Sequence, residues 1–167
     1  MVQVLEHCNA IAMLYAFLKT LHVLSIVVWV GGMVFAHFFL RPAASALEPP
    51  QRLTLMHGVL RRFFTAITYL SLLALFTGFW MMGSVAKAVV QGGGEFTAPV
   101  DWTVMALLGT LMVLIFGHIR FALYGRLSKA VTAADWPAAG VALDKIRQWV
   151  LVNLSIGVVI IVVTLLM

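Results

Sequence analysis

The chain has 167 residues, of which 63% are hydrophobic and 10% are charged. Ordinary soluble domains are about 45–50% apolar and about one quarter charged. This composition excludes a disordered chain, a basic nucleic-acid-binding domain and an ordinary soluble fold, so no nucleic acid partner is expected. The net charge of +5 reflects an excess of Lys and Arg. In a membrane protein the placement of these residues indicates the orientation of the chain. The single cysteine, Cys8, excludes an internal disulfide and any CxxC motif.

Four apolar segments are long enough to cross a bilayer, because a hydrocarbon core of about 30 Å takes about 20 helical residues. Their expected bounds are 13–40, 63–82, 102–124 and 149–167. The predicted fold class is therefore all-α, a polytopic membrane protein with an up-down bundle of four transmembrane helices. We expect a single membrane domain over residues 1–167, in which residues 1–12 form an optional N-terminal extension.

The connections between these spans contain residues that typically begin a helix. Glu48-Pro49-Pro50 forces an extended turn before a helix that begins near Gln51. Asp135 is suited to cap a helix, and Pro137 suits its first turn. The segment from Trp136 to Arg147 is expected to be a helix on the membrane surface that leads into the fourth span.

Aromatic residues mark the ends of the spans, as in an interfacial belt. The belt residues are Trp102, Tyr124, Trp136 and Trp149. Trp29 differs, because it lies in mid-span and must pack inside the bundle or against lipid.

The basic residues predict an orientation. Nine Lys and Arg fall in or beside the two connections that share one side, against two, Lys19 and Lys87, on the side of the termini. By the positive-inside rule the two basic connections are cytoplasmic. The expected location is the bacterial inner membrane, with both termini and the glycines at 92–94 in the periplasm.

Small and polar residues inside the spans indicate helix contacts. Gly32 with Ala36, and Ala74 with Gly78, are pairs of small residues four apart, which allow close helix packing. Asn153 is a polar group expected to face the interior of the bundle.

Three histidines on three helices, His37, His57 and His118, fall at one depth near the expected cytoplasmic boundary. Intramembrane ionisable residues often mark function. An up-down order would place the first and third helices diagonally, so His37 and His118 are candidates for bis-imidazole ligation of haem b. The alternative is that both imidazoles only form hydrogen bonds and that His57 is solvated.

Three arginines lie at or just below the same boundary. If haem is bound, they are placed for its propionates; otherwise they snorkel to lipid phosphates. They are Arg61, Arg62 and Arg120.

A second set of donors lies near the expected periplasmic face. Imidazole and thioether together form a soft donor set suited to Cu(I). The candidate metal ligands are His22, Met81, Met82 and Met105, with His57 as a further imidazole. Met112 continues the methionine stripe two turns deeper. The alternative is that these methionines only fill the core.

Two segments of the chain resemble the copper resistance protein D (CopD) family. The first is LHVLSIVVWVGGMVF, residues 21–35, followed by Arg41-Pro42; the second is RRFFTAITYLSLLALFTG, residues 61–78. The resemblance runs from about Leu14 to the C-terminus. Family members often carry a Lys in the third span, near Gly109 here, and a Glu in the fourth, where this chain has Asn153. The resemblance implies copper handling in the inner membrane.

We therefore expect an integral inner-membrane protein of CopD type involved in copper transport or tolerance. One alternative is a b-type haem protein in electron transfer or oxidoreduction, and another is a cofactor-free structural or accessory subunit. The sequence contains no nucleophile–base pair, paired carboxylates or phosphate loop, so enzyme chemistry without a cofactor is not expected. The expected partners are the lipid bilayer and a periplasmic copper-binding protein, with a homo-oligomer as an open alternative.

Overall fold

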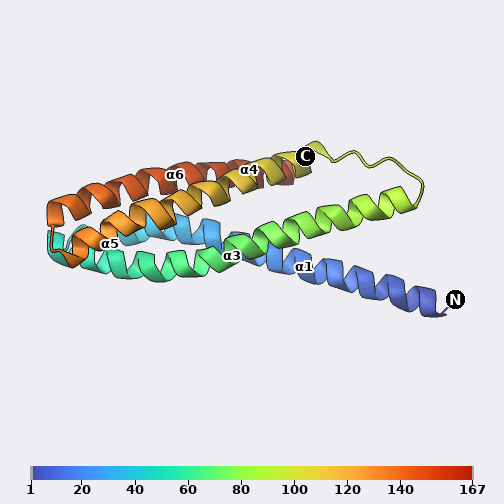
Figure 1. Cartoon of the computed structure of the whole chain (residues 1–167), viewed down its shortest axis with the longest axis horizontal. Coiled ribbons are helices and arrows are strands. Elements are labelled where there is room, and N and C mark those ends of the chain that lie inside the picture. The colour runs from blue at the N-terminus through green and yellow to red at the C-terminus, as the bar shows by residue number, and fades with distance from the viewer. Residues whose placement is uncertain (1, 167) are drawn as a thin grey trace.

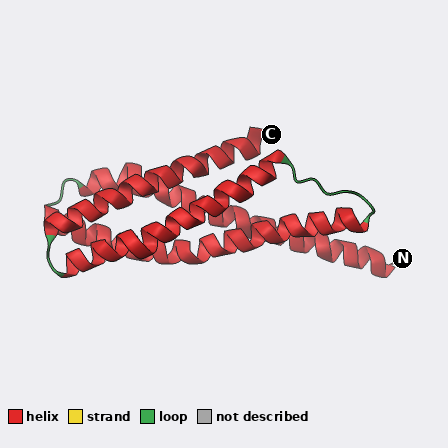
Figure 2. Ribbon diagram, turned by 45° about the horizontal axis from the view of Figure 1, so that its top comes forward, coloured by secondary structure: helices red, strands yellow, loops and turns green. Residues whose placement is uncertain are grey.

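The computed structural model describes the backbone of residues 2–166 and the side chains of residues 9–166. This part of the chain is helical, with short connections and no strand (Figures 1 and 2). His7 and Cys8 have side chains outside the described set. The elements are α1 (Val2–Phe35), the π-helix η1 (Ala36–Leu40), α2 (Arg41–Ala44), α3 (Pro49–Gln91), α4 (Val100–Gly117), the π-helix η2 (His118–Leu123), α5 (Tyr124–Thr132) and α6 (Trp136–Leu166).

Because η1 and η2 continue their neighbours, the elements form four long rods. Within the described residues, four rods are long and apolar enough to cross a membrane, which confirms the expected fold class. Their candidate spans are 9–44, 49–91, 100–132 and 136–166.

The rods are longer than the predicted apolar spans. The second span, expected over 63–82, lies within α3, a helix of 43 residues that measures about 65 Å at 1.5 Å per residue. Apolarity marks only the lipid-facing stretch, whereas the helix continues through polar residues on both sides. For the same reason, residues 136–147 form no separate surface helix. They are the first turns of the continuous helix α6.

The four rods run up and down, as predicted (Figure 1). α1 packs mainly on α3, while α4 and α5 pack on α6, which also touches α1 and α3. The connections at residues 45–48 and 133–135 lie at one end of the bundle, and both termini point to the other. The outer ends of α1 and α3 extend past α4 and α6 at the end of the termini.

The helix starts follow the expected local chemistry. Glu48 is extended, with φ −57° and ψ 147°, and α3 begins immediately at Pro49. The carboxylate of Asp135 accepts a hydrogen bond from the amide of Ala138 at 3.0 Å, which confirms the predicted cap of α6. In the loop at 92–99, Gly93 has φ 82°, a left-handed conformation that glycine adopts without strain.

Edge-to-face aromatic contacts join the first three rods in the core. The ring of Phe116 lies 5.8 Å from that of Trp29 and 5.8 Å from that of Phe64. Trp29 is therefore inside the bundle. Tyr124 was expected in the interfacial belt, but its ring is buried 5.6 Å from Phe64. The prediction was wrong because a span end is also a place where a neighbouring helix can cover an aromatic ring.

The outside of the bundle is covered with large apolar side chains, as contact with lipid requires. All four rods contribute to this surface, and many of the side chains are more than half exposed. Examples are Phe17, Phe76, Leu107, Leu114, Phe121 and Leu165.

Candidate functional site

The imidazole of His22 bridges two helices. Its Nδ1 lies 2.9 Å from the carbonyl oxygen of Ala74 on α3 and 3.1 Å from Oγ1 of Thr77. A carbonyl oxygen only accepts, so Nδ1 carries the proton. Nε2 of the neutral ring then has a free lone pair. His22 is thus held in one tautomer, with its second nitrogen available as a ligand.

Small residues on α3 make room for this ring. A Cβ atom at Gly78 would lie 3.1 Å from Cε1 of His22, and Ala74 is buried beside it. The predicted small-residue pair Ala74 and Gly78 therefore supports a close helix contact, as expected. Its particular role is to admit an imidazole.

Buried hydroxyl groups lie one turn deeper in the same seam between α1 and α3. Ser25 follows His22 by three residues, Ser71 precedes Ala74 by three, and both are 2% exposed. Each donates to its own helix, Ser25 to the Leu21 carbonyl at 2.8 Å and Ser71 to the Thr68 carbonyl at 3.2 Å. Neither serine was predicted from the sequence. Their spacing from His22 and Ala74, on one face of each helix, was the available signal.

The predicted methionine donors divide into two groups. Met81 is 9% exposed and follows Gly78 by three residues, so it lies one turn beyond His22 on the same face of α3, toward the end of the termini. Met82 and Met105 are half-buried on α3 and α4, which pack together. Met112 is a core residue that packs against Gly157 of α6. Met81 is therefore the methionine that the fold aligns with His22.

His57 is engaged between α3 and α5. Its Nε2 lies 3.2 Å from Oγ of Ser128, and its ring stacks on Tyr124 with centroids 5.4 Å apart. The hydroxyl of Tyr124 donates to the carbonyl oxygen of His57 at 3.3 Å. His57 is half-buried rather than fully solvated, and it contacts none of the other metal candidates through these bonds.

His37 lies in the π-helix η1 and His118 begins the π-helix η2, but the two histidines have different surroundings. His37 is half-buried at a pocket that also borders α6, and its ring packs 4.8 Å from that of Phe38. His118 is exposed, with its ring 5.4 Å from that of Trp149. Bis-imidazole ligation of haem by this pair stays a prediction.

The arginines assigned to haem propionates lie on the outside of the bundle. Arg61 and Arg62 are exposed on α3. The guanidinium of Arg120 lies 5.3 Å from the ring centroid of Tyr124, a cation–π contact. Their alternative role as residues that snorkel to lipid phosphates is compatible with these positions.

Among the described residues, no group of three or more His, Cys, Asp or Glu side chains gathers as a metal site. The donors that accompany His22 in its seam are instead a thioether and hydroxyl groups. The thioether is a soft donor and the imidazole carries no charge, so these two groups suit a monovalent copper ion better than a hard divalent ion.

The sequence of this bundle matches a known protein family. The family model of copper resistance protein D matches residues 57–167, about two thirds of the chain. The chain belongs to the copper resistance protein D family. The matched region includes Met81, Met82, Met105 and His118, and it begins after α1, so it does not contain His22. No curated protein and no solved structure matches the chain.

Proposed function

We propose that this member of the copper resistance protein D family binds Cu(I) in the membrane at the seam between α1 and α3, with His22 and Met81 as ligands. The observation that carries the proposal is the hydrogen bond from Nδ1 of His22 to the Ala74 carbonyl. It leaves Nε2 as a nitrogen ligand in a half-buried position, as in many metal sites where the other ring nitrogen donates to a carbonyl.

The ligand chemistry agrees with a copper ion as cargo. Imidazole nitrogen and thioether sulfur bind Cu(I) without adding negative charge to the membrane interior. Ser25 and Ser71, buried one turn deeper, offer hydroxyl oxygens further along the same seam. The seam therefore provides a short path of polar groups in the middle of α1, where that helix packs on α3.

The direction of access follows from the proposed orientation. The nine basic residues of the two connections favour the cytoplasm for the end that holds loops 45–48 and 133–135. The termini, and with them the outer side of the His22 seam, then face the periplasm of the inner membrane. A periplasmic copper-binding protein is the expected donor.

Cu(I) binding by the purified full-length chain tests the proposal. A chromophoric Cu(I) chelator in competition reports the affinity of the parent, of His22→Ala and of Met81→Leu. We expect His22→Ala to lose the tightest copper ion and Met81→Leu to weaken binding by about tenfold or more. His118→Ala is the matched control, because that imidazole is exposed on the outer surface.

Growth of cells across copper concentrations is the second readout of these variants. If His22→Ala binds Cu(I) as the parent does and leaves copper tolerance unchanged, copper is not handled at this seam.

A further inference from the structure

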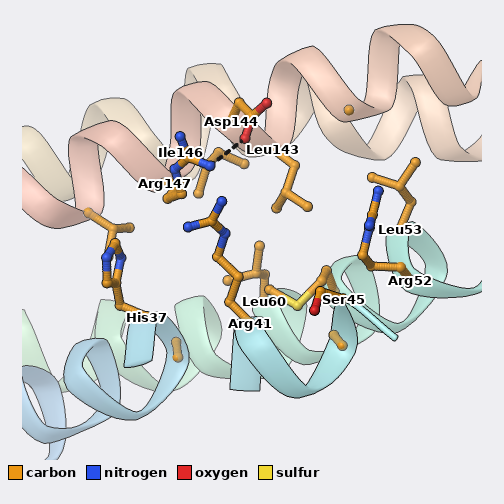
Figure 3. A pocket seen from close by; sticks show the side chains of 15 residues that line it. His37, Arg41, Ser45, Arg52, Leu53, Leu60, Leu143, Asp144, Ile146 and Arg147 are labelled. Atoms are coloured by element: carbon orange, nitrogen blue, oxygen red, sulfur yellow. Dashed lines mark hydrogen bonds and ion pairs between the residues drawn. The ribbon is translucent and has the colours of Figure 1, made fainter. Parts of the chain in front are cut away.

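A pocket opens at the other end of the bundle, beside the connection at residues 45–48. It has a volume of about 360 Å³ and lies between η1 and α2 on one side, the start of α3, and α6 on the other (Figure 3). Small residues form part of its wall, which explains why the helices leave space there. They are Ala36, Ala44 and Gly140.

Basic side chains from three different helices line this pocket. Arg41 comes from α2, Arg52 from α3 and Arg147 from α6, and His37 lines the same space. In Figure 3, Arg41 and His37 extend from the lower helices toward α6. The single carboxylate is that of Asp144, so three guanidinium groups and one carboxylate leave a net charge of +2.

The charge in the pocket is only partly compensated. Asp144 pairs with Arg147 at 2.9 Å, the one salt bridge within the described part of the chain. Arg41 and Arg52 therefore have no carboxylate partner among the described residues. Guanidinium groups that line one pocket from separate helices favour a shared anion, and phosphate accepts paired hydrogen bonds from such groups.

The floor of the pocket is apolar. Four of its side chains are at most 6% exposed: Leu53, Met56, Leu60 and Ile146. Leu143 completes this floor from α6. A free inorganic anion gains nothing from such a surface, whereas an amphiphile places its chain there while its charged group meets the arginines.

The depth of the pocket agrees with that of lipid headgroups. The long apolar run of the first rod ends at Arg41-Pro42, and α6 still carries Asp144, Lys145 and Arg147 before its apolar stretch begins at Trp149. We propose that the pocket binds an anionic phospholipid, with its phosphate among Arg41, Arg52 and Arg147 and an acyl chain over the Leu53 and Leu143 side. Basic pockets between transmembrane helices bind such headgroups in other proteins. The proposal is independent of copper binding at the opposite end.

Native mass spectrometry of the full-length protein tests this site, with phosphatidylglycerol and phosphatidylcholine of the same acyl chains as probes. We expect the parent to retain phosphatidylglycerol in preference. The double variant Arg41→Gln/Arg52→Gln should lose about tenfold or more of this preference. Arg61→Gln/Arg62→Gln is the matched control, since it removes the same charge from exposed positions outside the pocket.

Two further measurements distinguish binding of a phospholipid from simpler explanations. Leu143→Trp fills the floor while keeping every charge, and it should also reduce retention of phosphatidylglycerol. Circular dichroism melting checks that each variant is folded. An equal loss in the Arg61/Arg62 control would show general surface attraction and overturn the site. Two results together would show a site for free phosphate and overturn the proposal of a bound lipid. They are displacement of the lipid by millimolar inorganic phosphate, and unchanged retention of phosphatidylglycerol by Leu143→Trp.

Discussion

Gly78 lies so close to His22 that a methyl group on it would stand 3.1 Å from Cε1 of the imidazole. This separation is shorter than ordinary van der Waals contact, so the position of the ring depends on residue 78 having no side chain. The hydrogen bond to Ala74 and the proposed copper ligand therefore both rest on a glycine in the neighbouring helix.

The first prediction concerns this glycine. Gly78→Ala should displace the imidazole and weaken Cu(I) binding by about tenfold or more, because a ligand that loses its orienting hydrogen bond binds less well. Gly83→Ala, on the same helix, is the control, since a Cβ there meets nothing within 4 Å. The readout is the chelator competition described above. Equal affinities for the two variants would contradict the role of Gly78.

The second prediction concerns the contact between α1 and α3. A Cβ atom at Gly32 would overlap the ring of Phe63, whereas one at the adjacent Gly31 would meet nothing within 4 Å. Gly32→Ala should therefore lower the free energy of unfolding by about 1–3 kcal/mol through overpacking. Gly31→Ala should leave it unchanged or raise it by up to about 1 kcal/mol, since alanine favours helix. Reversible unfolding in mixed detergent micelles measures both. A Gly32→Ala protein as stable as the parent would show that Phe63 moves at no cost.

The third prediction concerns Asn153, which is 1% exposed in α6. Neither its side-chain nitrogen nor its side-chain oxygen has a hydrogen-bond partner among the described residues. An unsatisfied buried polar group costs about 1–3 kcal/mol, so Asn153→Leu should raise the melting temperature. Asn153→Asp should lower it, because a carboxylate is costly within the membrane. A lower melting temperature for Asn153→Leu would indicate that the amide has a stabilising role.

Much of this architecture follows from the sequence. The four spans, the up-down order, the cap at Asp135 and the inward position of Asn153 all derive from local rules that the structure confirms. For Trp29 the sequence left the bundle interior and the lipid as alternatives, and the structure places it inside. Such rules work here because a bilayer restricts each apolar segment to a helix with satisfied backbone groups.

The candidate site was less accessible to sequence reasoning. Depth along a helix is read from residue number, but the direction in which a side chain points around the axis depends on tertiary packing. His37 and His118 share a depth, yet one lines a pocket and the other is exposed on the surface. The π-helices at both positions add to the difficulty, since one extra residue in a turn shifts all later side chains by about 100°. Ser25 and Ser71 were missed because their burial depends on the facing helix.

The fourth prediction concerns orientation. In a Cys8→Ser background, Gly93→Cys places a thiol in the loop at 92–99 and Ala134→Cys places one in the loop at 133–135. A membrane-impermeant maleimide should label the first variant in intact spheroplasts and the second only after permeabilisation, because the nine Lys and Arg in the helices that flank loops 45–48 and 133–135 favour the cytoplasm. The reverse pattern of labelling would invert the topology and, with it, the side from which copper reaches His22.

The π-helix η1 divides the first rod into two segments. The directions of their side chains around the helix axis are set separately. Residues before it, such as His22 and Gly32, are positioned by α3, whereas Arg41 immediately after it is positioned by the lipid-binding pocket proposed above. Forcing residues 36–40 into a regular α-helix without removing a residue would rotate Arg41 by about 100° away from that pocket, without disturbing the His22 seam. The widened turn therefore acts as a spacer that lets the two ends of one helix be altered separately during evolution.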